Sequence, residues 1–210
     1  MKFNPIAGGH DFFKPPNAEQ FFIQEEQEKA SNNGTFASDI IKEQNKLYWC
    51  DLVIFQFPFW WFGIPAILKG WFDRVFAYGW AYGRNERFDS GRLKGRRALL
   101  SITTGSPKER FSDGKLFAPI EHILYPITVG TLQYVGFQVL EPYIAWGLSR
   151  AHDSLRDAYF EEYHLKLTQI ESQVCLPDHT IREFPDPTDS TFERPTNILK
   201  ELMKNREISE

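Results

Sequence analysis

The stretch that decides the fold is DLVIFQFPFWWFGIPAILKGWFDRVF, residues 51–76. Its first part, 51–58, is an almost unbroken apolar run that ends at a proline, which is typical of a strand buried on both faces of a parallel sheet. In its second part, apolar side chains recur every three or four residues between Ile64 and Phe76. Pro65 stands where the first turn of a helix tolerates a proline. The stretch therefore predicts a buried strand followed by an amphipathic helix.

Elements of the same two kinds are expected on either side of this stretch. Ser38 can cap the helix expected at 38–48. Strands that alternate with helices predict an α/β fold with a parallel sheet, in which right-handed crossovers place helices on both faces. Outside 51–76, the hydrophobic patterns predict strands at 98–104 and 137–142, and helices at about 18–29, 38–48, 119–134, 153–173 and 197–205.

The composition fits one domain with a substantial core and excludes several other classes of protein. Of the 210 residues, 42% are hydrophobic and 16% are aromatic, so global disorder is excluded. The net charge of −4 comes from mixed acidic and basic residues without a basic stripe, which argues against nucleic acid as a partner. The two cysteines, Cys50 and Cys175, suggest neither a disulfide scaffold nor a metal site. They fit a reducing compartment.

The start of the chain and one apolar region bear on whether targeting or membrane segments are expected. The first 25 residues contain no continuous apolar run, so no secretory signal is expected. The longer apolar region, 52–72, is interrupted by Pro58, Gly63 and Pro65 and changes its periodicity midway. Two short elements explain this region better than a membrane span does.

Two segments follow the first two expected strands and should meet at the carboxyl edge of the sheet, where open α/β sheets bind ligands. One is the aromatic loop, residues 58–63, and the other is the Thr-Thr-Gly turn, residues 103–105. Aromatic faces could stack on a flat heteroaromatic ring, while hydroxyl and backbone N–H groups bond its carbonyl oxygens. The residues alone leave a second interpretation equally open, in which Trp60, Trp61 and Phe62 only cover the sheet.

Several stretches closely resemble the NAD(P)H:quinone oxidoreductase family of flavodoxin-like flavoproteins. The similarity is most specific at 55–83, FQFPFWWFGIPAILKGWFDRVFAYGWAYG, and continues at 1–6, 91–105 and 124–143. It covers about residues 1–173, so we expect a flavodoxin-like domain at 1–175 and an extended tail with a short helix at 176–210. The resemblance implies a cytoplasmic homodimer that binds FAD and passes a hydride from NAD(P)H to a quinone-like acceptor in a ping-pong scheme.

The resemblance also implies roles for individual residues. Arg156 matches an arginine near the adenosine side of the flavin. Tyr82 matches a tyrosine that lines the substrate pocket of the partner subunit, and Phe111 is a second expected substrate-binding position. The remaining cofactor-binding positions match the loop that contacts the isoalloxazine ring and the turn that holds its polar edge: Pro58, Phe59, Trp60, Trp61 and Phe62 in the loop, and Thr103, Thr104 and Gly105 in the turn.

The sequence departs from the family pattern inside the predicted site. Phe111 and Phe117 occupy the positions of a tyrosine and a histidine that are thought to stabilise charge on the reduced flavin. Phenylalanine neither donates a hydrogen bond nor takes a proton, so no catalytic residue is expected. His122, five residues beyond Phe117, is interpreted as an ordinary histidine rather than a replacement.

A second departure concerns the start of the family pattern. Met1 aligns inside that pattern, and the opening strand, phosphate-binding turn, helix and second strand have no counterpart ahead of Asp51. A start at an internal methionine would explain this, and so would a short variant that binds FAD weakly. The missing turn and the two phenylalanines favour a second interpretation of the chain, a non-catalytic interaction or regulatory subunit, for example of a membrane transporter. The intact aromatic loop and Thr-Thr-Gly turn favour the enzyme.

Overall fold

The structure is a computed structural model that describes residues 3–13 and 21–178. The chain divides into two compact units, Met1–His179 and Thr180–Glu210, and all described elements belong to the first. The expected helix at 197–205 and most of the expected tail lie outside the described residues. The predicted domain boundary at residue 175 stays a prediction.

The centre of the first unit is a parallel sheet, as the sequence predicted. β1 (Leu52–Pro58) pairs with β2 (Arg97–Thr103) along its whole length. β2 also pairs with β3 (Gln138–Val139) near its start and with β4 (Tyr143–Ala145) near its end. β3 lies inside the single strand predicted at 137–142, whereas β4 follows that range and was not predicted. The ladder breaks between them because Pro142 has no N–H to donate.

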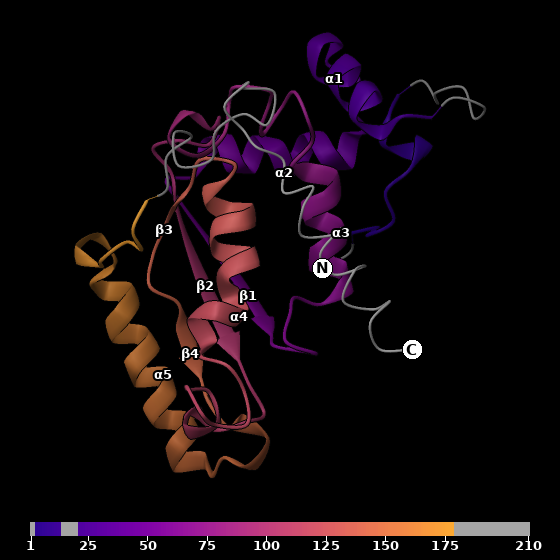
Figure 1. Ribbon diagram of the computed structural model, residues 1–210. Helices are drawn as coiled ribbons and strands as arrows, with labels where there is room; N and C mark the ends of the chain where they lie inside the picture. The colour runs from indigo at the N-terminus through magenta and orange to yellow at the C-terminus, as the bar shows by residue number, and fades with distance from the viewer. Residues whose placement is uncertain (1–2, 14–20, 179–210) are drawn as a thin grey trace, which may run out of the picture. The chain divides into compact units, whose positions relative to one another are not determined.

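Helices join and flank the strands (Figure 1). In that view the strands lie in the middle, with α5 along one side and α3 on the other. Within residues 3–13 and 21–178, no helix combines the length and apolar character needed to cross a membrane. The helices are α1 (Ile23–Asn33), α2 (Ser38–Trp49), α3 (Ala66–Val75), α4 (Ile120–Ile127) and α5 (Asp153–Thr168).

The two faces of the sheet carry different side chains. On one face Phe55 is buried against α3, with ring centroids 5.8 Å from Trp71 and 5.2 Å from Phe72. On the other face, the Tyr143 hydroxyl donates a hydrogen bond to the carbonyl oxygen of Tyr159 in α5, at 2.6 Å. Helices therefore cover both faces, as expected for crossovers of one hand.

The prediction that 51–58 is buried on both faces is wrong for the face toward α5. Phe55 and Phe57 are buried, but Ile54 is 38% exposed and Gln56 is exposed as well. The reason is that α5 stands off the sheet: it carries no buried residue, and a cavity of about 400 Å³ separates it from β1, β2 and β4. An apolar run in the sequence cannot distinguish a strand covered by two helices from one covered by a single helix.

Some helix boundaries also differ from the predicted ones. α1 begins at Ile23 and ends at Asn33, where Gly34 turns the chain with a φ of 66°. The predicted helix at 18–29 is thus shifted, and residues 18–20 lie outside the described part. Ser38 is the first residue of α2 rather than its cap, because Ala37 occupies the capping position. α5 ends at Thr168 rather than at residue 173.

The helix predicted at 119–134 changes its winding midway. α4 is followed directly by a π-helix, η5 (Thr128–Gln133). Pro126 lies inside α4 and has no N–H, so the regular ladder cannot continue unchanged. The Thr131 hydroxyl donates to the carbonyl oxygen of Pro126 at 3.0 Å and so adds a side-chain hydrogen bond where α4 passes into η5.

Residues 3–13, which we call the N-terminal segment, cross α3 at very close range. A Cβ atom on Gly70 would lie 2.0 Å from the carbonyl oxygen of Pro5, so only glycine fits at this crossing. The fully buried Arg74 holds the segment, with Nε bonding Asp11 at 2.7 Å and Nη1 bonding the Asn4 carbonyl at 2.8 Å. Nη1 also bonds Asp39 of α2 at 2.8 Å. The segment is therefore tied to the core, although only Asp11 and Phe12 of it are buried.

The sheet–α5 contact makes stability sensitive to alkaline pH. Burial raises the pKa of the Tyr143 phenol from 10 to about 12, and the charge of Glu162 adds to the effect. Between pH 10 and about 12, the phenol has lost its proton in the unfolded chain but still holds it in the folded one. Because the unfolded state binds fewer protons in this range, the free energy of unfolding falls as the pH rises. We expect a loss of about 1–2 kcal/mol after solvent screening is allowed for.

Urea unfolding at a series of pH values from 9 to about 12, within the alkaline range of tyrosine, measures this loss. The matched variant Tyr143→Phe should be less stable at pH 9 by about 1 kcal/mol, because it lacks the hydrogen bond to Tyr159. Its stability should then decline less than that of the wild type. Equal declines in both proteins would show that the Tyr143 phenol does not carry the effect.

Candidate ligand site at the carboxyl edge of the sheet

The aromatic loop leaves β1 in a strained turn. Trp61 and Phe62 have φ values of 51° and 58°, in the left-handed region that aromatic residues rarely adopt. The turn is closed by a hydrogen bond from the Gly63 N–H to the Trp60 carbonyl at 3.0 Å. The Trp61 side chain is 97% exposed. A strained backbone that holds an indole in solvent favours ligand stacking over the alternative that these residues only cover the sheet.

The Thr-Thr-Gly turn lies beside this loop. Phe59 donates its N–H to the Thr103 carbonyl at 2.8 Å, which ties the two segments together. The Thr104 side chain is buried, and its hydroxyl donates to the Ser106 carbonyl at 2.6 Å. This hydroxyl therefore shapes the turn. Gly105 is exposed, and its carbonyl accepts a hydrogen bond from the Ser149 hydroxyl at 3.0 Å, so its N–H is the backbone group that can face a ligand.

One cavity, which we call the aromatic cavity, brings together the aromatic loop, the end of the Thr-Thr-Gly turn, and the pair Phe111 and Phe117. Its volume is about 170 Å³. The Phe117 ring lies 4.9 Å from Phe62 and 5.0 Å from Phe111, and Phe111 lies 5.1 Å from Trp146. Flat apolar walls suit a flat ring system, and the Gly105 N–H can bond the polar edge of such a ring. The lining residues are Phe59, Trp61, Phe62, Thr104, Gly105, Ser106, Phe111 and Phe117.

Not all predicted site residues share the aromatic cavity. Pro58 ends β1 and Trp60 is 63% exposed, and neither lines the cavity. Thr103 and Arg156 instead line the cavity of about 400 Å³ under α5. There the Arg156 guanidinium bonds Asp153 at 3.0 Å.

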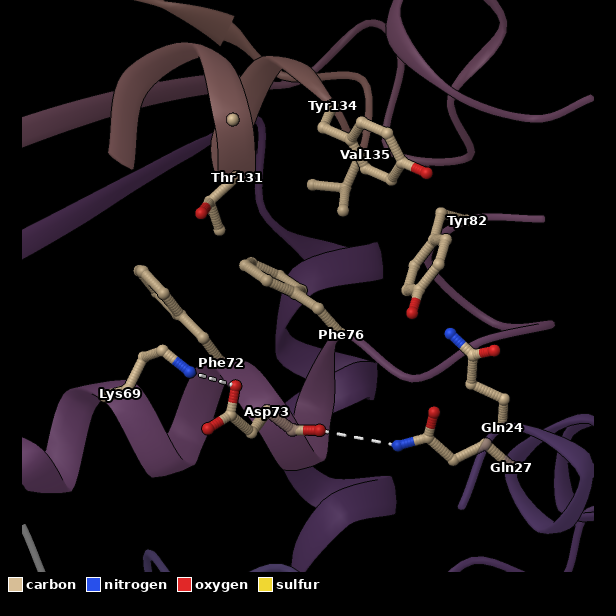
Figure 2. A pocket seen from close by; sticks show the side chains of 11 residues that line it. Gln24, Gln27, Lys69, Phe72, Asp73, Phe76, Tyr82, Thr131, Tyr134 and Val135 are labelled. Carbon is tan, nitrogen blue, oxygen red and sulfur yellow. Dashed lines mark hydrogen bonds and ion pairs between the residues drawn. The ribbon is translucent and has the colours of Figure 1, made fainter. Parts of the chain in front are cut away.

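Tyr82 lines a third cavity, of about 370 Å³, between α1, α3 and η5 (Figure 2). Its ring packs edge-on against Tyr134, with the centroids 5.5 Å apart. Burial raises the pKa of the Tyr82 phenol, although a hydrogen bond with Gln24 opposes the shift. Figure 2 shows both rings over the same space, with Phe72 and Phe76 at its floor. Tyr82 therefore does not face the aromatic cavity of its own chain.

Among the aromatic residues that sequence reasoning missed are Tyr134, which lines the cavity of Tyr82, and Trp146, which packs against Phe111 without lining any of the three cavities. Trp146 follows β4, a strand that was not predicted. Tyr134 stands inside the stretch 124–143 that carries the family resemblance, and that stretch was the only signal for it. His122 is exposed and lines none of the three cavities, which agrees with its interpretation as an ordinary histidine.

Comparisons with known proteins agree with this geometry. The family model for the flavodoxin-like fold matches residues 3–167. A ribosyldihydronicotinamide dehydrogenase-like protein of Penicillium crustosum is 35% identical over 209 residues, covering 96% of this chain and 75% of its own. The NAD(P)H dehydrogenase (quinone) 1 of Rattus norvegicus is 39% identical over 171 residues, which are 81% of this chain. The chain spans 62% of the length of that rat protein.

Solved structures of similar proteins share this fold. A crystal structure from Klebsiella pneumoniae assigned as a quinone reductase superposes with a TM-score of 0.79 at 35% identity, covering 84% of this chain and 71% of that one. The general stress protein 14 of Treponema denticola, solved in complex with FMN, superposes with a TM-score of 0.53 at 26% identity. The superposition covers 64% of this chain and 72% of the Treponema protein. The fold and cavity thus define a flavodoxin-like α/β protein. Within that class, the chain belongs to the NAD(P)H:quinone oxidoreductase family.

Proposed function

We propose that the protein is an FAD-dependent oxidoreductase that passes a hydride from NAD(P)H to a quinone or similar flat acceptor by a ping-pong mechanism. The observation that carries the proposal is the exposed Trp61, held on a strained loop at a cavity that Thr104 and Gly105 of the Thr-Thr-Gly turn also line. The names of the rat and Penicillium relatives support the same reaction class.

The chain's own residues would bind and orient the flat rings. Trp61, Phe62 and Phe117 offer aromatic faces, and the Gly105 backbone offers an exposed polar contact. A bound flavin supplies the two-electron chemistry that no side chain here provides. In a ping-pong scheme, NAD(P)⁺ would leave before the acceptor enters the same space.

The cavity under α5 supports FAD rather than FMN. Arg156 shares it with the aromatic residues Tyr159, Phe160 and Tyr163. A guanidinium among flat aromatic faces suits an adenosine group, which FAD has and FMN lacks. The Treponema relative binds FMN, so the choice of flavin needs a direct measurement.

The separation of Tyr82 from the aromatic cavity supports a homodimer. Tyr82 and Tyr134 form one aromatic wall, and the proposed flavin-binding residues form another on a different part of the chain. A second copy of the chain can bring the two walls face to face. We propose that the working form is a cytoplasmic homodimer with sites between the two copies.

Titration of the purified chain with FAD and with FMN tests the proposal. We expect FAD to bind more tightly than FMN and its absorbance to bleach when NADH or NADPH is added without oxygen or acceptor. A quinone added afterwards should restore the oxidised spectrum, and steady-state kinetics should give parallel double-reciprocal lines. Failure to bind either flavin would contradict the proposal and favour the non-catalytic subunit that Phe111 and Phe117 also suggest.

A further inference from the structure

A fourth cavity, which we call the amino-edge cavity, lies at the amino ends of β2 and β3. Gly95 precedes β2 and Gln138 begins β3, so this cavity lies at the opposite edge of the sheet from the aromatic cavity. Its volume of about 320 Å³ is enough for a small organic ligand. Of the residues that the structure describes, none lines both this cavity and one of the other three. Its lining includes Phe88, Lys94, Gly95, Gln133, Gly136 and Asp178.

One of the lining side chains is a buried amide whose oxygen is not satisfied. Gln133 is 3% exposed, and its Nε2 donates to the Pro177 carbonyl at 2.9 Å. Its Oε1 has no hydrogen-bond partner within the part of the chain that the structure describes. Buried amide oxygens are nearly always paired, because an unpaired one has lost its hydration without compensation. This oxygen only accepts hydrogen bonds, so a ligand that satisfies it must carry an N–H or O–H donor.

The charged residues of the amino-edge cavity favour a cationic donor. Asp89 and Asp178 are carboxylates, and Lys94 is the only cation among the lining residues that the structure describes. A donor that also carries a positive charge gains attraction from the carboxylates, and its hydrogen bonds are of the stronger, charge-assisted kind. An anion would gain only Lys94 and would leave the amide oxygen of Gln133 without a donor.

Five arginines lie nearby in the sequence, between residues 84 and 97, but none of them lines the amino-edge cavity. Two of them are bonded to other parts of the chain. Arg92 pairs with Glu86 at 2.6 Å, and Nη2 of Arg96 donates to the Tyr48 carbonyl of α2 at 2.9 Å. The charges that a ligand in this cavity meets directly are therefore those of its own lining.

We propose that the amino-edge cavity binds a small organic cation with N–H donors, of the amine, amidine or guanidine class. Its N–H groups donate to Oε1 of Gln133 and to the Asp178 carboxylate, and an attached flat group packs beside Phe88 and Phe137, which line the same cavity. This site is separate from the proposed flavin and acceptor sites, so its existence does not depend on the proposed function.

Titrations of isotope-labelled protein, followed by NMR of its amide groups, test the proposal. The probes are benzamidine, benzamide and benzoate, which share a phenyl ring and carry a positive, no and a negative charge. We expect benzamidine to bind about tenfold more tightly than benzamide, and benzoate to bind more weakly still. The full chain is used in its own oligomeric state, so a cavity closed by a second copy would give no binding. Absence of binding, or equal binding of benzamidine and benzamide, would overturn the proposal.

The same spectra locate the ligand, because each cavity contains a glycine whose amide signal reports on it. Benzamidine should shift the signals of Gly136 and of the Gln133 side chain in the amino-edge cavity. Gly105 of the aromatic cavity and Gly130 of the Tyr82 cavity should not respond. Shifts at Gly105 or Gly130 without shifts at Gly136 would place the cation elsewhere and contradict the proposal.

Two exposed residues of the lining provide matched variants with opposite expected effects. Asp178→Asn removes a carboxylate and should weaken benzamidine binding about two- to fivefold, the range for an exposed charge. Lys94→Gln removes the cation and should strengthen it by a similar factor. Neither change should alter benzamide binding, since benzamide is uncharged. A general loss of structure cannot produce effects of opposite sign, and unchanged benzamidine affinity in both variants would show that the cation does not bind here.

Discussion

Replacement of Arg74 by methionine is expected to lower the free energy of unfolding by about 3–5 kcal/mol. The guanidinium is fully buried and bonds Asp11, Asp39 and the carbonyl oxygen of Asn4. Methionine fills much of the space but leaves Asp11, whose side chain is 3% exposed, without its cationic partner. The loss comes mainly from this buried carboxylate, which keeps only the Gly8 N–H at 3.2 Å and His10 at 3.3 Å as partners. Urea unfolding at neutral pH measures it.

Asp39→Asn is the matched control, because Asp39 bonds the same guanidinium but its side chain is 44% exposed. Water can replace that interaction, so we expect a loss of no more than about 1 kcal/mol. Adding Asp11→Asn to Arg74→Met should recover part of the stability, since it removes the buried charge. If Arg74→Met and Asp39→Asn cost the same, burial does not set the strength of this network.

Replacement of Trp61 by alanine should separate binding from folding. We expect flavin affinity to fall by about 1–3 kcal/mol, which is five- to about 150-fold, the range for an aromatic anchor. The free energy of unfolding should stay within about 0.5 kcal/mol of the wild type, because the side chain is 97% exposed. Flavin titration measures the affinity, and urea unfolding of the same samples measures the free energy of unfolding.

Trp71→Ala is the control for an aromatic residue in the core. Trp71 is 4% exposed and packs against Phe55, Phe72 and Phe76. Its removal should cost about 3–5 kcal/mol of stability. A Trp61→Ala protein that loses stability on this scale while binding flavin normally would show that the aromatic loop is packing and not a binding site.

The sequence predicted well those features that depend on local patterns. β1, α3 and β2 were expected from apolar periodicity, and they are present within one or two residues of the predicted bounds. The aromatic loop and the Thr-Thr-Gly turn were expected to meet because both follow parallel strands, and Thr104 and Gly105 of the turn line one cavity with three residues of the loop. Their role in binding stays a prediction.

Features that depend on distant parts of the chain could not be predicted. The N-terminal segment seemed polar and loop-like, but its place is set by Arg74 and by the absence of a side chain at Gly70, both of which come from α3. In the same way, no local pattern places Thr103 and Thr104 in different cavities, since that depends on where α5 lies.

The loose seating of α5 has a consequence for how tightly Arg156 can hold anything. The helix is held by the hydrogen bonds of Tyr143 and Tyr159 and by a ring contact between Tyr143 and Tyr163, without a buried side chain of its own. Such an element opens locally at a free energy well below that of global unfolding, and its amides exchange with solvent early. A ligand that binds through Arg156 must therefore bear the entropy cost of ordering the helix. Its affinity then depends as much on the rigidity of α5 as on the contacts that Arg156 makes.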